Sequence, residues 1–229
     1  VDEREPRDRM RELLMNSTLL DEEYHSEVKP FGILASLPFK VYVTTTYDDL
    51  MVNALKRSSR DVQRSWCKWK GTHDSPGKES EDNARPINVA NPLVFHLFGH
   101  VGGKNDERSD EEKDDDELAM KSMVITEDDY LEFLQKTSRQ PQLIPTRIHR
   151  AFGSASLLFL GYQPMSTEFR VLLRSLATFL KGQAKHVSVQ VIAEREIIAS
   201  PHMRQAQEYL ARRYKNLNIT MCWVDTKEF

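Results

Sequence analysis

Short apolar runs alternate with longer stretches of helical periodicity along most of the chain. Runs rich in β-branched and aromatic residues are typical of strands, and a continuous apolar run is typical of a strand covered on both faces. The pattern predicts strands at residues 39–43, 93–98, 123–125, 156–160, 187–193 and 218–224, and helices at residues 7–20, 31–37, 46–56, 126–136, 144–152, 166–180 and 203–214. Because strands alternate with helices, we expect an α/β fold: a doubly wound, mainly parallel sheet with helices on both faces.

Two polar stretches interrupt this pattern. Residues 58–91 contain Pro76, Gly77 and Pro86, which favours a long, partly irregular excursion. Residues 104–117 hold nine acids against three bases and no apolar residue, so we expect an acidic, disordered loop. A calcium loop is the alternative, but the required Asp-x-Asp-x-Asp-Gly spacing is missing. The rest of the chain forms no basic stripe interleaved with aromatics, so no direct nucleic-acid binding is predicted.

The composition indicates a protein of the reducing cytoplasm. The chain has 229 residues, 39% of them hydrophobic, which suits one domain of an ordinary globular protein. Its two cysteines, Cys67 and Cys222, lie far apart and form neither a disulfide framework nor a zinc spacing. No apolar run approaches the roughly 20 residues of a membrane span, so no membrane partner is expected.

Three segments follow predicted strands: residues 44–49, 96–103 and 161–167. Parallel sheets bind ligands at the carboxyl ends of their strands, so these segments are the candidate site. Residues 44–49 (TTTYDD) precede a predicted helix, whose N-terminus would suit a phosphate or a ribose. A purely structural interpretation is also open, because Thr46 and Asp49 have the spacing of a capping box.

The second segment carries His96 and His100, a spacing that would suit zinc on a helix. His96 lies in a predicted strand and His100 beyond Gly99, and no third ligand is apparent, so we predict no metal site. The chain has no Gly-x-Ser-x-Gly elbow, no phosphate-binding Gly-x-x-x-x-Gly-Lys motif and no Gly-x-Gly-x-x-Gly motif. In the third segment, Gly161 would let a backbone or a ligand approach closely.

Taken together, four ordered motifs resemble the bacterial sirtuin-like (silent information regulator 2-like) domain family. Residues 37–50 (LPFKVYVTTTYDDL) resemble its Thr-Thr-Asn-Tyr-Asp segment, and residues 93–100 (LVFHLFGH) resemble its His-Leu-His-Gly segment. Residues 124–131 (VITEDDYL) match the helix start that follows, and residues 156–162 (SLLFLGY) with Phe169 and Arg170 resemble its adenine-side strand and helix. The similarity extends from about Phe31 to the C-terminus.

The resemblance implies a Rossmann-like domain that binds NAD. Members of the family often act as NAD hydrolases (NADases) in antiphage defence, a form of bacterial immunity, and some belong to larger assemblies. We therefore expect partner subunits or fused domains, with a homo-oligomer as an alternative. We also expect a single domain over residues 1–229, without the family's Gly-rich strand–turn–helix, which would precede residue 1. The residues assigned to cofactor binding are Thr44, Thr45, Thr46, Asp48, Gly99, Gly161 and Tyr162.

Two family positions depart from the pattern. The catalytic Asn of the family falls at Thr46, and its catalytic His falls at Phe98. A phenyl ring cannot take a proton, and a hydroxyl cannot reproduce the paired donor and acceptor of an amide. Thr46 would still serve as a helix cap. The sequence thus predicts a catalytically degenerate pseudoenzyme that binds NAD or ADP-ribose or keeps a structural role.

Two alternatives stay open. His96, which shares the predicted strand face of Phe98, or His100 could act as a substitute base in an active NAD hydrolase. A pure interaction module is the other alternative, in which residues 104–117 would dock a basic partner.

Overall fold

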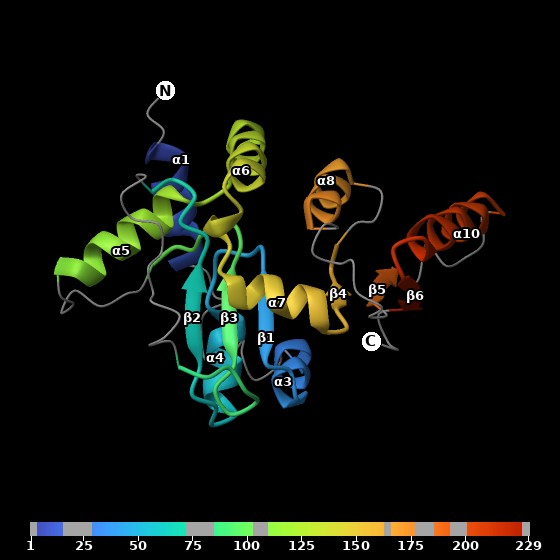
Figure 1. Cartoon of the computed structure of the whole chain (residues 1–229), viewed down its shortest axis with the longest axis horizontal. Helices are drawn as coiled ribbons and strands as arrows, with labels where there is room; N and C mark the ends of the chain where they lie inside the picture. The colour runs from blue at the N-terminus through green and yellow to red at the C-terminus, as the bar shows by residue number, and fades with distance from the viewer. Residues whose placement is uncertain are drawn as a thin grey trace. The chain divides into compact units, whose positions relative to one another are not determined.

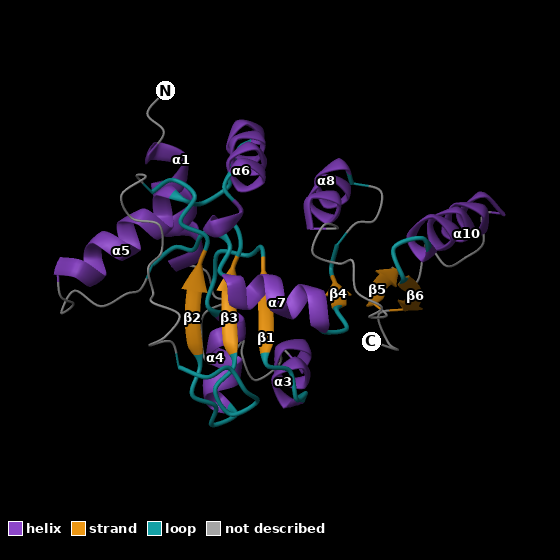
Figure 2. Ribbon diagram, in the orientation of Figure 1, coloured by secondary structure: helices purple, strands orange, loops and turns teal. Residues whose placement is uncertain are grey.

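The computed structural model describes residues 4–15, 29–71, 85–102, 110–162, 166–176, 186–192 and 201–225. The chain divides into two compact units, Val1–Pro145 and Thr146–Phe229. Each unit holds a three-stranded parallel sheet flanked by helices, so the predicted α/β, Rossmann-like fold class is confirmed (Figures 1 and 2). None of the described helices is both long and apolar enough to cross a membrane.

The first unit contains the sheet that carries the candidate site. Its strands are β1 (Val41–Thr44), β2 (Gln63–Trp66) and β3 (Leu93–His96), in the order β1-β3-β2. Its helices are α1 (Arg4–Met15), α3 (Lys29–Ser36), α4 (Leu50–Arg57), α5 (Asp110–Lys121), α6 (Glu127–Arg139) and the 3-10 turn η3 (Pro141–Leu143). The central strand β3 is buried along its whole length, as expected for a strand with neighbours on both sides and covered faces.

One face of this sheet packs against α3 and α4. The core there contains Ala35 of α3, Leu55 of α4 and Val94 of β3, all fully buried. The apolar stripe of α4, formed by Met51, Val52, Ala54 and Leu55, is the buried face that the sequence periodicity predicts. Toward the carboxyl ends of the strands, α5 and α6 lie beyond the sheet (Figure 1).

The second unit contains the strands β4 (Leu158–Leu160), β5 (His186–Ile192) and β6 (Ile219–Asp225) with the helices α7 (Thr146–Ser154), α8 (Thr167–Leu176) and α10 (Pro201–Lys215). All its strand pairs are parallel, in the order β4-β5-β6. The core of this unit joins α8, α10 and β6 through Phe169, Leu173, Leu210, Tyr214 and Ile219. Helix α7 ends at Ser154, two residues beyond the predicted end at residue 152.

Residues 123–125, predicted as a strand, are not one. Together with Ser122 they form a connection whose carbonyl oxygens accept hydrogen bonds from distant side chains: Trp69 donates to Ser122, Arg7 to Met123 and Tyr47 to Val124. The Val124 N–H donates to the carbonyl of Phe98 at 3.1 Å. The apolar run Met123–Ile125 is explained by burial, because Met123 and Val124 are buried beneath these contacts. A buried backbone needs hydrogen-bond partners, and here side chains provide most of them.

The acidic stretch also differs from its prediction. Residues 110–117 form the first two turns of α5, while residues 104–109 lie outside the described part of the chain. The helix is supported by ion pairs of Lys68 with Asp115 at 2.9 Å and of Lys121 with Glu117 at 2.7 Å. Its last turn carries the fully buried Ala119. The apolar residues that anchor this helix follow the acidic run, which is why the run alone indicated a loop.

Candidate functional site

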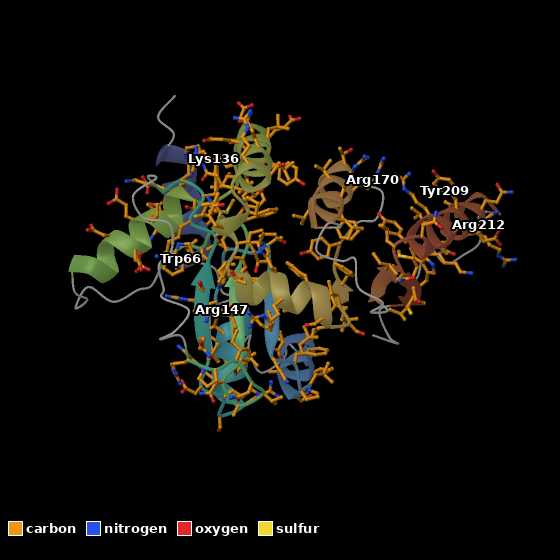
Figure 3. The ribbon with its side chains drawn as sticks, viewed as in Figure 1. Trp66, Lys136, Arg147, Arg170, Tyr209 and Arg212 are labelled. Carbon is orange, nitrogen blue, oxygen red and sulfur yellow. The ribbon has the colours of Figure 1, made fainter. Side chains whose placement is uncertain are left out.

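Three strand ends lie side by side at the carboxyl edge of the first sheet. Thr44 of β1 and Trp66 of β2 both pair in register with His96 of β3, between them. Residues opposite each other in neighbouring strands point to the same face, so these three side chains share one face of the sheet edge. Trp66 lies at this end of β2 (Figure 3). The structure therefore places the predicted residues 44–49 and His96 at one site.

Hydroxyl groups line the loop that follows β1. The Oγ1 atoms of Thr44 and Thr46 lie 2.9 Å apart, and the Thr46 N–H donates to Thr44 Oγ1 at 3.1 Å. Thr45 is half-buried between them, and Thr46 is exposed. The Leu50 N–H donates to Asp48 Oδ1 at 2.9 Å. Four of the seven residues assigned to cofactor binding, Thr44, Thr45, Thr46 and Asp48, thus form one compact polar loop.

The predicted capping box of Thr46 and Asp49 is wrong. Helix α4 begins at Leu50, its N-cap residue is Asp49, and no side chain makes a capping hydrogen bond from that position. The loop is longer than the sequence suggested because Thr46 closes a turn with Thr44 instead of starting the helix. A capping box does form at the start of α6, within the predicted helix start at residues 124–131: Thr126 Oγ1 accepts from the Asp129 N–H, and the Asp129 carboxylate accepts from the Thr126 N–H.

His96 is fully buried at the centre of the site. Its Nδ1 lies 3.2 Å from the carbonyl oxygen of Thr46. A carbonyl can only accept, so Nδ1 carries the hydrogen and a neutral His96 keeps its lone pair on Nε2. Burial lowers the pKa of His96, and this outweighs the opposite effects of the Thr46 carbonyl and the Asp49 carboxylate. His96 is therefore neutral at pH 7.

A carboxylate and a guanidinium complete this cluster. Asp49 Oδ1 lies 3.9 Å from His96 Nε2, and Asp49 Oδ2 accepts from Arg64 Nη1 at 2.8 Å. Arg64 and Trp66 belong to β2, which the sequence analysis treated as part of an irregular excursion. The only local signal was the short run from Val62 to Trp69, which is richer in apolar and aromatic side chains than the residues around it.

His100 holds the opposite tautomer. Its Nδ1 accepts the Gly102 N–H at 2.8 Å, so the hydrogen of a neutral His100 is on Nε2. The ring is buried and packs edge-on against Trp66, with 4.7 Å between the ring centroids, and 5.3 Å from the ring of His96. With its lone pair already engaged by Gly102, His100 is poorly suited to accept a proton.

Phe98 lies away from the cluster. Strand β3 ends at His96, so Phe98 does not share a strand face with His96 as the sequence analysis expected. Its ring packs against α6 instead, 5.2 Å from the ring of Phe133 and 5.9 Å from that of Tyr130, both edge-on. An aromatic side chain at this position thus contributes to the apolar contact between the strand end and α6.

The three remaining residues assigned to cofactor binding have different surroundings. Gly99 has φ +76, and a Cβ there would lie 2.7 Å from the backbone of Ala119 and Met123. The absence of a side chain at Gly99 therefore lets the backbone of residues 119–123 pack closely against it. Gly161 also has a positive φ, +72, but no atom of the described residues lies within 4 Å of its Cβ position. Tyr162 stacks on Phe169 with 4.9 Å between the centroids. Gly161 and Tyr162 belong to the second unit.

The chemistry available at the site is that of hydrogen-bond acceptors and hydroxyls. Within the described residues, no three His, Cys, Asp or Glu side chains converge where they could hold a metal ion. Cys67, just beyond β2, is buried, and burial raises the pKa of its thiol to about 12, so it is no nucleophile at neutral pH. The loop 44–49 and His96 thus present hydroxyl groups, a carboxylate and an imidazole lone pair at the strand ends.

Comparison with protein families matches residues 40–221 to the SIR2-like domain. A comparison with curated proteins finds no match. The matched region includes β1, β3, α6 and β4, where the four motifs lie, and it covers well over half of the chain. The chain therefore belongs to the SIR2-like domain family.

Proposed function

We propose that this chain is an NAD- or ADP-ribose-binding SIR2-like domain that has lost the family's catalytic chemistry. Proteins of the SIR2-like family generally bind NAD, and the polar loop 44–49 lies at the strand ends where parallel sheets take their ligands. The observation that carries the proposal is the packing of Phe98 on Phe133 and Tyr130. Phe98 occupies the position of the family's proton-accepting histidine, and its ring has an apolar role there.

Thr46 supports the same proposal. It occupies the position of the family's amide side chain, but its hydroxyl pairs with the hydroxyl of Thr44. An amide side chain would present an N–H donor and a carbonyl acceptor next to each other. The hydroxyl of Thr46, paired with that of Thr44, does not. Binding without cleavage is therefore the activity that these two positions favour.

The test is incubation of the full chain with NAD, with release of nicotinamide and retention of the dinucleotide measured in parallel. We expect saturable binding and no robust turnover. Robust turnover that Phe98→Ala abolishes would overturn the proposal. Asp61→Asn is the control, because Asp61 is an exposed carboxylate paired with Arg85, outside the site. It should bind NAD as the wild type does.

A second candidate is an active NAD hydrolase with His96 as a substitute base. The observation that favours it is the tautomer: the Nε2 lone pair of His96 is on the side of Asp49, whereas that of His100 is engaged by Gly102. In this case His96→Ala should remove nicotinamide release while the fold survives. His100→Ala should reduce it less. Unchanged release in both variants would end this candidate.

The family resemblance further suggests a place in antiphage defence within a larger assembly. The relevant measurement is the cellular NAD level during phage infection, with and without this chain. If the chain acts as a binding or structural subunit, deleting it should abolish protection, and Asp61→Asn, at the exposed carboxylate outside the site, should leave protection intact. Protection that does not depend on the chain would contradict such a role.

A further inference from the structure

The two units of the chain carry opposite net charges. Residues 146–229 hold 12 lysines and arginines against six aspartates and glutamates, a net charge of +6. Residues 1–145 hold 20 lysines and arginines against 29 aspartates and glutamates, a net charge of −9. A unit with a large positive charge attracts polyanions, and the arrangement of its basic side chains decides which polyanion it can bind.

Basic side chains gather on two neighbouring helices of the second unit, α8 and α10. These helices share one core, in which the ring centroids of Phe169 and Tyr214 lie 6.1 Å apart. Arg170 and Arg213 are the chain neighbours of these two core residues, and both are exposed. Burial raises the pKa of the Tyr214 phenol, whereas the charges of Arg213 and Arg170 lower it. Both guanidinium groups therefore lie near the same hydroxyl, although they belong to different helices.

Tyr209 is an exposed aromatic side chain beside these arginines. It is 55% exposed, and its hydroxyl accepts a hydrogen bond from Arg213 Nη1 at 3.3 Å. Arg212, three residues along α10, is also exposed, and its guanidinium lies 3.8 Å from the carboxylate of Glu208. Glu208 is the one acid among the side chains that the structure describes in α8 and α10. Arg170, Tyr209, Arg212 and Arg213 form what we call the basic patch, and Figure 3 labels three of them at the edge of the second unit.

The basic patch offers what the two parts of a single-stranded nucleic acid need. Guanidinium groups bind phosphate oxygens through their charge and their paired N–H donors. An exposed aromatic ring gives an unpaired base a surface to stack on, and proteins that bind single strands without sequence preference combine these two elements. A carboxylate-rich protein surface would satisfy the guanidinium groups alone and would leave the ring of Tyr209 in water.

We propose that the basic patch binds single-stranded nucleic acid, with phosphates on Arg170, Arg212 and Arg213 and a base stacked on Tyr209. This binding goes beyond the proposed nucleotide-binding function and does not depend on it. The sequence alone predicts no nucleic-acid binding, because no continuous stretch of the chain interleaves bases with aromatics. The patch exists only where α8 and α10 pack on their common core.

The experiment is fluorescence anisotropy of a labelled oligothymidylate of about 20 nucleotides, longer than one binding site, titrated with the full chain at several salt concentrations. With three phosphate contacts, the logarithm of the affinity should fall with the logarithm of the salt concentration with a slope of about −2. Arg212→Gln and Arg213→Gln should each bind about fivefold more weakly at about 0.1 M salt and reduce the steepness of this slope by about 0.7.

Arg139→Gln is the matched control for these two variants. Arg139 is an exposed base in the last turn of α6, as Arg212 and Arg213 are in the last turn of α10. A base in the last turn stabilises its helix in either place, but Arg139 belongs to the first unit, outside the patch. Arg139→Gln should therefore bind oligothymidylate as the wild type does.

Tyr209 is tested separately, because its contribution depends on an unpaired base. Tyr209→Ala should bind oligothymidylate about fivefold more weakly or worse, the effect of losing one stacked base, whereas Tyr209→Phe keeps the ring and should bind nearly as the wild type does. A duplex of the same length offers no unpaired base, so Tyr209→Ala should leave its binding unchanged. Glu208→Gln should strengthen the binding of both probes, because it removes the carboxylate beside Arg212.

Melting temperatures show whether each variant is folded. The proposal is overturned if the folded wild type does not bind oligothymidylate, or if the Arg212, Arg213 and Arg139 variants lose affinity equally. Displacement of the oligonucleotide by NAD would overturn it too, because the patch would then belong to the dinucleotide site. If a polyglutamate peptide competes as well as unlabelled oligothymidylate and Tyr209→Ala has no effect, the patch binds an acidic protein instead. None of these outcomes removes the proposed nucleotide binding, which is measured with NAD alone.

Discussion

Arg7 of α1 forms a buried ion pair with Asp129, the same carboxylate that closes the capping box of α6. Both side chains are more than nine-tenths buried. Burial alone would raise the pKa of Asp129, but backbone hydrogen bonds from Thr126 and Ile125 and the charge of Arg7 outweigh it and hold the pKa below its usual value. One carboxylate therefore joins the first helix of the chain to the start of α6.

Replacing Arg7 with Met should destabilise the first unit strongly. The substitution leaves Asp129 buried without its counter-charge, and breaking one side of a buried pair costs about 3–5 kcal/mol. Urea unfolding of the full chain measures the decrease in the free energy of unfolding. Arg9→Met is the matched control, since Arg9 pairs with Glu12 on the exposed face of the same helix, where a pair contributes about 0–1 kcal/mol. Equal losses in the two variants would contradict the role given to the buried pair.

Thr126→Ala should lower the free energy of unfolding by about 1 kcal/mol, because Thr126 supplies a capping oxygen to α6. Thr46→Ala should cost less than about 0.5 kcal/mol, because the hydroxyl of Thr46 caps no helix and lies on the surface. Chemical denaturation of the two variants, side by side, separates these values. A larger loss for Thr46→Ala would show that its turn with Thr44 supports α4 after all.

Gly99→Ala and Gly161→Ala should differ sharply although both glycines have positive φ. At Gly161 the added methyl would contact no described residue, so we expect only the strained backbone conformation to lower the free energy of unfolding, by about 1 kcal/mol. At Gly99 the methyl would lie 2.7 Å from three backbone atoms of residues 119–123, which cannot move independently. Loss of soluble, folded protein is the expected outcome there. Thermal denaturation checks both, and similar melting temperatures would refute the contrast.

The stability of the chain should fall as the pH drops below about 6.5. His96 has a lowered pKa in the folded protein, so the unfolded chain is protonated at this residue at a higher pH than the folded protein. Acid therefore stabilises the unfolded chain relative to the folded protein. The stability that depends on a neutral His96 is fully present above pH 6.5, which is the pKa of this residue in the unfolded chain. It is lost as the pH falls through the lower pKa that His96 has in the folded protein. The charged groups that act on His96 are Asp49, Arg64 and Asp48.

His96→Asn should therefore flatten the dependence of unfolding free energy on pH between about 6.5 and 5. Asp129→Asn tests a separate pH range. Because the pKa of Asp129 is lowered in the folded protein, the stability that its ionised carboxylate contributes is lost only below about pH 4. An unchanged slope in His96→Asn above pH 5 would mean that His96 is not the group that takes up the proton.

The sequence predicted the parts of the site that depend on local pattern. The two strands that end at the site and the start of α6 follow from β-branched runs and from residue spacing, and all three are present, although β1 ends at Thr44 and β3 at His96 instead of at residues 43 and 98. Contacts between distant parts of the chain left no such signal. Strand β2 is four residues long with half-buried side chains, so its alternation was too weak to recognise, and with it Arg64 was missed. The start of α4 was misplaced because Thr46 found a partner in Thr44.

The connection at residues 122–125 has a consequence for the order in which the molecule assembles. Three of its carbonyls accept hydrogen bonds from Trp69, Tyr47 and Arg7, which lie 53, 77 and 116 residues away from them along the chain. Closing such long loops is entropically costly and becomes favourable only when much of the sheet has formed. Tyr47 belongs to the polar loop 44–49, so that loop should acquire its final shape among the last events of folding.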